Sequence, residues 1–366
     1  GYGGTAASTV PGPNSPVKIK AGDSLYTSTG TIQCASLLDS GVVDVRDPSP
    51  KKFGTVTGNG KFIIRPIASS FTFPVGTFTS FFNNGGTVQY SDSTGLVESY
   101  TLPTSPSTYG NLILSSFTGN GVRQLPDGGI TINNDLTIRG STGVNFSDQA
   151  SGNIVVSGNL ILSSSGDSLR FLNGTARAIT VTGHVLVASG AVFHVQNAGT
   201  AVTNTLSIGK GLTNNGVFDM AASATRICDV TFTGTADDSI TGTGSTTDFN
   251  RLIVNKGTSQ TPTLRVNATN FTISGATDVS SRALTLTNGT FRLSSAQTVT
   301  LASGTSGLGY TIPATAQLWI DGGTAQITST VNENLVLRGK VRVSAGAFNV
   351  GTVTDGSVVN TLVYDA

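Results

Sequence analysis

The chain has 366 residues, a formal net charge of +1 and only 11% charged residues, less than half the usual share of a soluble globular protein. Its Lys and Arg residues are scattered singly, which argues against nucleic acid as a partner and against anchoring to an acidic membrane surface. No apolar run approaches the ~20 residues of a membrane-spanning helix, so we expect no membrane insertion.

Residues 1–16 form the first predicted segment, an entry or linker with the Pro-rich run PGPNSP. The chain begins at Gly1 rather than Met, which suggests a processed product or an internal piece of a longer protein. From residue 17 to residue 366 we expect one continuous all-β domain. Thr, Val, Ile and Phe dominate the segments that look ordered, and long runs of helix-favouring residues are absent.

A repeat of short alternating strands becomes clear near the middle of the chain. Its first apolar anchors are Ile130, Ile154, Ile179 and Leu206, which are 24, 25 and 27 residues apart. The second anchors follow six residues later at Leu136, Leu160, Val185 and Leu212, and a closing aromatic falls at Phe146, Phe171, Phe193 and Phe218. Looser copies begin at Leu264, Leu284 and Asn334.

This repeat predicts the fold. A period of 20–30 residues, with Gly, Asn and Ser between short strands, is typical of a solenoid whose turns bury their apolar faces only when stacked. We therefore predict a parallel β-helix (β-solenoid) of about 15 coils, at ~22–25 residues per coil. An antiparallel sandwich would need tight hairpins between paired strands, and a β-propeller would need a longer repeat with a fixed blade motif.

The two cysteines, Cys34 and Cys228, test this fold prediction. In a solenoid they lie about eight coils, or ~40 Å, apart. A disulfide needs Cα atoms within ~7 Å, so we expect no bond between them. We interpret each as a small buried residue, with an intermolecular bridge or metal ligation as the alternative.

Four segments resemble the β-strand-repeat surface proteins of gliding Bacteroidota. They are VPGPNSPVKIKAGDSLYTSTGTIQCASLLDSGVVDV (Val10–Val45), FPVGTFTSFFNNGGTVQYS (Phe73–Ser91), STYGNLILSS (Ser107–Ser116) and VTFTGTADDSITGTGSTTDFNRLIVNKG (Val230–Gly257). The resemblance implies a right-handed β-helix, export by the type IX secretion system, and work as an adhesin, stalk or filament. It also implies that the units near 73–116 and 230–257 are related. It does not extend to a C-terminal sorting domain or to an adhesive module.

Parallel β-helices also include polysaccharide lyases and glycosidases, so residues that could do chemistry were sought. The best acidic pair is Asp237 and Asp238, in TADDSI, which we interpret as a solvated turn. His184 and His194 lie ten residues apart without a neighbouring carboxylate in the sequence, and we interpret them as polar surface residues. We expect no catalytic, cofactor-binding or metal-binding residues.

Trp319 in QLWIDGG is the only Trp of the chain and the best candidate for stacking on a glycan. It alternates with Leu318 and Ile320, so one of these two sets faces outward. The other interpretation of Trp319 is a core filler or an end-cap contact.

Two serines are candidates for O-glycosylation by the resemblance, because the resembled organisms attach glycans at Asp-Ser or Asp-Thr followed by an aliphatic residue or Thr. Ser93 and Ser239 match this pattern at predicted turns.

We expect a non-enzymatic extracellular protein without a cofactor: a stiff solenoid segment of a cell-surface adhesin or filament. Its expected partners are other segments of a longer surface protein or an outer-membrane assembly, and surface glycans. The alternative is a polysaccharide-binding or polysaccharide-degrading β-helix protein of the lyase or glycosidase type. A groove that collects Asp, Arg and aromatic side chains would favour this alternative. A third possibility is an accessory subunit of an outer-membrane assembly.

Overall fold

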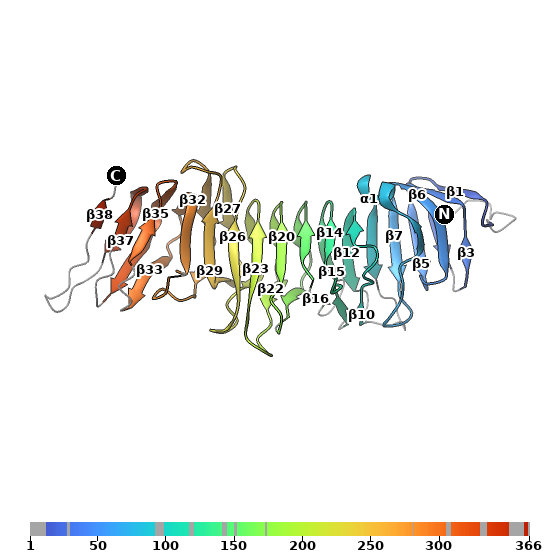
Figure 1. The fold of residues 1–366 in the computed structure, drawn as a ribbon, viewed down its shortest axis with the longest axis horizontal. Coiled ribbons are helices and arrows are strands. Elements are labelled where there is room, and N and C mark those ends of the chain that lie inside the picture. Colours follow the sequence, from blue (N-terminus) through green and yellow to red (C-terminus); the bar gives the residue numbers. More distant parts are fainter. Residues whose placement is uncertain are drawn as a thin grey trace. The chain divides into compact units, whose positions relative to one another are not determined.

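The computed structural model confirms a nearly all-β chain in which parallel strands stack as a β-solenoid of about 12 turns (Figure 1). The chain divides into two compact units, Gly1–Arg170 and Phe171–Ala366. The structure describes residues 12–27, 30–91, 99–116, 121–140, 145–149, 152–172, 174–280, 282–304, 309–329, 335–350 and 362–364.

The first unit consists of short strands and one short helix. Its elements are β1 (Pro16–Ile19), β2 (Ser24–Thr27), β3 (Ile32–Gln33), β4 (Ser36–Asp39), β5 (Val42–Arg46), β6 (Lys51–Gly58), β7 (Lys61–Arg65), β8 (Val75–Thr77), α1 (Thr79–Asn83), β9 (Thr87–Ser91), β10 (Tyr100–Thr101), β11 (Thr108–Tyr109), β12 (Asn111–Ser116), β13 (Val122–Gln124), β14 (Ile130–Ile132), β15 (Leu136–Gly140), β16 (Asn145–Gln149), β17 (Ile154–Val156), β18 (Leu160–Leu162) and β19 (Asp167–Phe171), whose last residue belongs to the second unit.

The second unit continues with strands alone in its described part. They are β20 (Ala178–Val181), β21 (Val185–Val187), β22 (Val192–Val195), β23 (Val202–Ile208), β24 (Leu212–Asn214), β25 (Val217–Asp219), β26 (Arg226–Phe232), β27 (Asp238–Thr241), β28 (Thr246–Phe249), β29 (Arg251–Asn255), β30 (Thr263–Val266), β31 (Phe271–Ile273), β32 (Leu284–Leu293), β33 (Thr298–Gly304), β34 (Tyr310–Ile312), β35 (Ala316–Ser329), β36 (Leu335–Leu337), β37 (Lys340–Val350) and β38 (Leu362–Tyr364).

The apolar anchors of the sequence repeat pair in register from one turn to the next. In the first unit, β14 pairs with β17 so that Ile130 faces Ile154, and β15 pairs with β18 so that Leu136 faces Leu160. In the second unit, Ile179 faces Leu206, Val185 faces Leu212 and Phe193 faces Phe218. The equivalences predicted within each unit are therefore confirmed.

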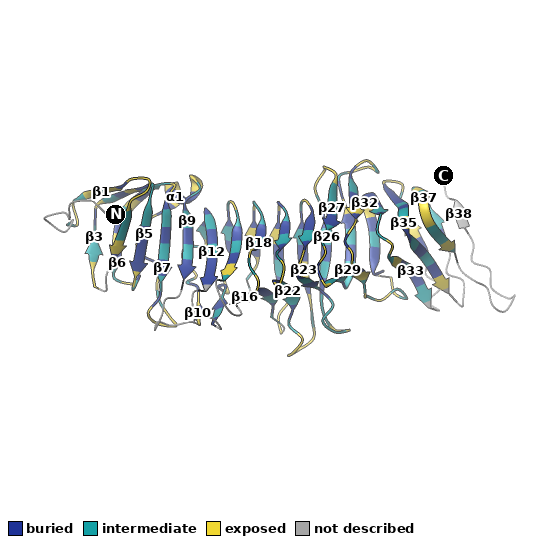
Figure 2. Ribbon diagram, turned by 180° about the vertical axis from the view of Figure 1, so that it is seen from behind, coloured by how far each residue is buried: buried dark blue, intermediate teal, exposed yellow. Residues whose placement is uncertain are grey.

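The core consists of inward columns that follow from this register. Buried and less buried residues alternate along the strands, for example along β26 (Figure 2). In the second unit the aromatic rings continue from turn to turn, with neighbouring ring centroids 5.2–6.5 Å apart. This aromatic column is Phe171, Phe193, Phe218, Phe249, Phe271 and Phe291.

The expected number of 15 coils is not confirmed, because many turns are longer than the 22–25 residues assumed. In the second unit, contacts between neighbouring turns join residues 27 and 28 positions apart, as for Gly211 with His184 and Thr241 with Thr213. The added residues lie at the corners between strands, where chain length is less constrained than in a paired strand.

Corners are closed by Asx turns, which confirms the role expected for Asn, Asp and Gly there. The backbone N–H of Gly41 donates to Asp39 Oδ1 at 3.0 Å, and that of Gly216 donates to Asn214 Oδ1 at 3.1 Å. One turn on, Gly58 has φ of 96°, and a Cβ there would lie 2.0 Å from the carbonyl oxygen of Asp39. Only glycine fits such a position.

Both cysteines are buried and free, as predicted. Burial raises the pKa of each thiol above its usual value, which agrees with the interpretation of small core residues.

The two segments predicted to be related differ in local structure. The first contains α1, in which Phe81 and Phe82 are buried, whereas residues 230–257 consist of strands and turns. Their relation stays a prediction, as does the continuity of the domain from residue 17. Strand β1 begins at Pro16, and residues 1–11 of the predicted entry segment lie outside the described part. No helix in the described part is long and apolar enough to cross a membrane.

Asp39 is a fully buried carboxyl group, and it gives a testable pH dependence. Burial raises its pKa to about 6, although backbone N–H groups of Gly41 and Lys61 partly offset the effect. The folded pKa lies above the unfolded one, so the free energy of unfolding falls as the pH rises through this interval. The full loss is on the order of 3 kcal/mol.

We therefore expect Asp39→Asn to raise the melting temperature more at pH 7.5 than at pH 4.5, where Asp39 is largely protonated. Thermal melts followed by circular dichroism at both pH values measure this difference. An effect of the substitution that is the same at both pH values would contradict this account.

Candidate functional site

An outward column of basic and aromatic side chains crosses four neighbouring strands of the second unit. Arg265 on β30 faces Arg292 on β32, Arg292 faces Trp319 on β35, and Trp319 faces Arg342 on β37. These four residues are called the Arg–Trp column below.

Alternation along the strands turns this column outward. Leu264 and Val266 flank Arg265, and Leu318 and Ile320 flank Trp319, and all four are buried in the core. Because successive side chains of a strand point to opposite faces, the residue between two core positions faces the exterior. Arg265 and Arg342 are exposed, whereas Arg292 and Trp319 are half-buried.

Trp319 stacks between two guanidinium groups. The Arg292 guanidinium carbon lies 3.8 Å from the centroid of the indole ring, and that of Arg342 lies 4.0 Å from it. Since β35 lies between β32 and β37, the two cations approach the ring from opposite sides. Each cation–π contact at such a position contributes about 0.5–1 kcal/mol, so the stack orients both Arg side chains.

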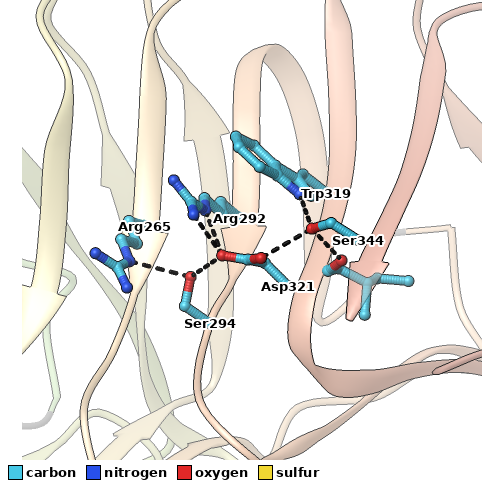
Figure 3. A network of polar contacts seen from close by, with 7 residues as sticks. Arg265, Arg292, Ser294, Trp319, Asp321 and Ser344 are labelled. Carbon is cyan, nitrogen blue, oxygen red and sulfur yellow. Dashed lines mark hydrogen bonds and ion pairs between the residues drawn. The ribbon is translucent and has the colours of Figure 1, made fainter. Parts of the chain in front are cut away.

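Asp321 connects the column to two serines (Figure 3). Arg292 Nε donates to Asp321 Oδ2 at 2.8 Å, and Arg292 also pairs with it through Nη2. Ser344 Oγ donates to Asp321 Oδ1 at 2.8 Å and accepts the indole N–H of Trp319 at 2.7 Å. Arg265 Nε donates to Ser294 Oγ at 3.0 Å.

This geometry fixes the charge state of Asp321. Its pKa lies below the usual value because Arg292 and Ser344 donate hydrogen bonds to the carboxylate. A carboxylate held ionised in this way is a poor general acid. The arrangement is suited instead to binding anions, because Arg presents a planar fork of donors to carboxylate and sulfate groups.

Trp319 is not a core residue, which corrects one of its two interpretations. It is outward-facing, as the glycan-stacking prediction requires, but Arg292 and Arg342 stack on its two faces. A sugar ring can stack on the indole only if a guanidinium moves away. The stacking role stays a prediction, and the structure places cations rather than a bare ring at this surface.

Asp237 and Asp238 do not converge on a common point. Asp238 Oδ2 accepts a hydrogen bond of 2.7 Å from Lys256 Nζ, whose side chain is fully buried and which also donates to the carbonyl of Thr233 at 2.8 Å. Asp237 is exposed and accepts the backbone N–H of Thr263 from the next turn at 2.8 Å. Both carboxylates hold turns together, so the interpretation of a merely solvated turn understated their role.

The two histidines are half-buried side chains of one turn. His184 Nδ1 accepts the backbone N–H of Gly211 at 3.3 Å. His194 faces Asp219 in register, a carboxylate neighbour that the sequence does not reveal because it lies a full turn away. Among the described residues, no group of three or more His, Cys, Asp or Glu side chains is placed to hold a metal ion.

Of the two glycosylation candidates, Ser239 faces Arg265 in register and is half-buried, at the edge of the Arg–Trp column. Ser93 lies outside the described residues.

The sequence contains a signal for the column, although its residues were considered singly. Arg265, Arg292 and Trp319 are spaced at intervals of 27, and Arg342 follows after 23. These intervals match the turn length of this unit. Comparison of the chain with protein-family models, curated proteins and solved structures found no match.

The buried Lys256–Asp238 pair predicts a strong stability effect. Lys256→Met leaves the mostly buried Asp238 carboxylate without its counter-charge, and removal of one partner of such a pair typically costs about 3–5 kcal/mol. We expect a clearly lower melting temperature for Lys256→Met, and partial recovery when Asp238→Leu is added. Asp237→Asn is the matched control and should have a small effect. A Lys256→Met variant as stable as the unaltered chain would contradict the assignment.

The Arg–Trp column predicts charge-selective quenching of the fluorescence of the single Trp. The guanidinium groups beside the ring attract iodide and repel caesium. The ratio of iodide to caesium quenching should therefore exceed that of N-acetyltryptophanamide and should fall in Arg342→Gln. An unchanged ratio in this variant would show that Arg342 does not lie over the ring.

Proposed function

We propose that the chain is a non-enzymatic extracellular structural or adhesive protein, a stiff right-handed β-solenoid segment of a cell-surface adhesin or filament. The parallel in-register stacking of turns supports this proposal most strongly. Each turn pairs through backbone hydrogen bonds with the turns before and after it, so the stiffness of a unit does not depend on any one side chain.

The outer surface supports the same proposal. Uncharged side chains such as Thr180, Ser207 and Thr231 follow one another in register on the outside of the second unit. Like charges one strand apart repel, so hydroxyl columns let many turns stack without that cost and make the stacking insensitive to salt.

The resemblance to surface proteins of gliding Bacteroidota supports an extracellular location at the cell surface and type IX secretion. The partners that follow are other segments of a longer surface protein or an outer-membrane assembly, together with surface glycans.

One observation favours the polysaccharide-binding alternative, namely the Arg–Trp column. Polysaccharide degradation has weaker support. Asp237 and Asp238 are held by Thr263 and Lys256, and Asp321 is held ionised by Arg292. Glycosidases need two carboxyl groups that face each other across the scissile bond, one of them protonated.

Single-molecule pulling of the full chain tests the structural role. We expect release of whole turns in discrete steps of about 90 Å, the extended length of ~27 residues. Featureless extension at low force would contradict a load-bearing solenoid. A reducing-end assay with polysaccharide substrates tests the non-enzymatic part of the proposal, and release of sugar ends by the purified chain would contradict it.

A further inference from the structure

The geometry points to a binding site for an acidic polysaccharide on the outer face of the second unit. Arg265, Arg292, Arg342 and the neighbouring Lys340 would bind its carboxylate or sulfate groups. This inference deepens the proposed function, on which it rests for its biological role, since a solenoid that carries such a site is an adhesive one.

The first argument is an excess of positive charge. Lys340 lies two residues before Arg342 on β37, and both are exposed. The four strands β30, β32, β35 and β37 thus present four cations, and the carboxylate of their described residues is Asp321. Asp237 adds a second carboxylate at the edge, one turn before β30, while Asp238 pairs with buried Lys256.

The second argument is an unfavourable contact that the fold retains. Arg265 and Arg292 face each other in register, and strands in a sheet are ~4.8 Å apart. Like charges placed directly opposite each other on neighbouring strands destabilise a sheet. Asp321 contacts Arg292, whereas the printed partner of Arg265 is the uncharged Ser294. An anionic ligand would supply the missing counter-charge.

The third argument is preorganisation of the donors. Stacking on Trp319 uses the flat faces of the Arg292 and Arg342 guanidinium groups and leaves their N–H edges outside the stack. Among the described residues, Arg342 has the ring as its contact and no hydrogen-bond acceptor. A carboxylate or sulfate can therefore dock without loss of an existing hydrogen bond of Arg342, and little side-chain entropy is lost on binding.

The fourth argument identifies the kind of polymer. The cations succeed one another across strands at intervals of one or two strand spacings, which suits an extended chain with a charge on successive or alternate sugars. Single-stranded nucleic acid is a poorer match. Its binding sites use open aromatic faces on which bases stack, and both faces of Trp319 are covered by Arg.

The single Trp makes the test local. Trp319 fluorescence is followed as the full chain is titrated with polygalacturonate, heparin, neutral dextran and an oligo-dT strand. We expect a saturable change with polygalacturonate or heparin that weakens as salt is added, because exposed charges are screened. The comparison of these two polymers distinguishes carboxylate from sulfate groups. Dextran should cause no change, and oligo-dT should bind at least about tenfold more weakly.

Matched charge variants locate the site. Arg265→Gln and Arg342→Gln should each weaken binding by about tenfold, the equivalent of one charge-assisted hydrogen bond, measured by calorimetry because Arg342→Gln alters the fluorophore's surroundings. Lys210→Gln removes one exposed positive charge elsewhere in the same unit and should change affinity by less than about twofold. Circular dichroism melts establish that each variant is folded.

Three results would overturn the inference. They are no saturable response to either acidic polymer, equal weakening by Lys210→Gln and Arg342→Gln, and oligo-dT binding as tight as that of the polysaccharides. Each is distinguishable from failure of the proposed function. A chain that unfolds in turn-sized steps but binds no acidic polymer keeps its structural role, whereas a chain that binds and cleaves the polymer keeps the site and loses the non-enzymatic assignment.

Discussion

Parallel in-register pairing is the constraint on which the rest of the structure depends. It places every side chain against its equivalent one turn earlier and one turn later, ~4.8 Å away. Inward columns then become continuous apolar stacks, such as the one that contains Phe193 and Phe218. Outward columns must avoid repulsion, so most of those described are uncharged. The pairing of Arg265 with Arg292 is an exception to this rule, and it lies at the surface with the best case for a ligand.

The corners follow a second rule, that a buried polar group needs a partner. Asn214 satisfies it fully, because its side-chain oxygen accepts from Gly216 and its amide donates to Thr246 and Thr247. Lys256 satisfies it with Asp238. Asp39 satisfies it in part, since Oδ2 has no partner among the described residues, and the raised pKa of this carboxyl group reflects that environment.

Sequence alone was sufficient for the features that repeat at short range. The anchors Ile130 and Leu136 predicted both the strands β14 and β15 and their register, because alternation and spacing survive in the printed letters. The short helix α1 was not predicted, since its five residues are held by aromatic packing around Phe81 rather than by helix propensity.

The candidate site was harder to predict because its members lie a full turn apart. Trp319 was recognised as a candidate, but its two Arg neighbours were not, since nothing near residue 319 in the sequence mentions residues 292 or 342. The same separation hid Asp219 from His194. Both juxtapositions need the turn length of this unit, which varies from 23 to 28 residues at described contacts. Variation of this size moves a predicted neighbour by several positions.

Disulfide trapping across neighbouring turns tests the central claim most directly. Under mild oxidation, cysteines introduced together by Arg265→Cys and Arg292→Cys should join, because their Cα atoms are one strand spacing apart, within the ~7 Å limit for a disulfide. The pair made by Thr263→Cys and Arg292→Cys is displaced by two residues and should join far more slowly. Cys34 and Cys228 are buried and do not compete. Rapid joining of the first pair alone is the predicted result, and equal rates for both pairs, or no joining of the first, would contradict the register on which the fold and the Arg–Trp column both depend.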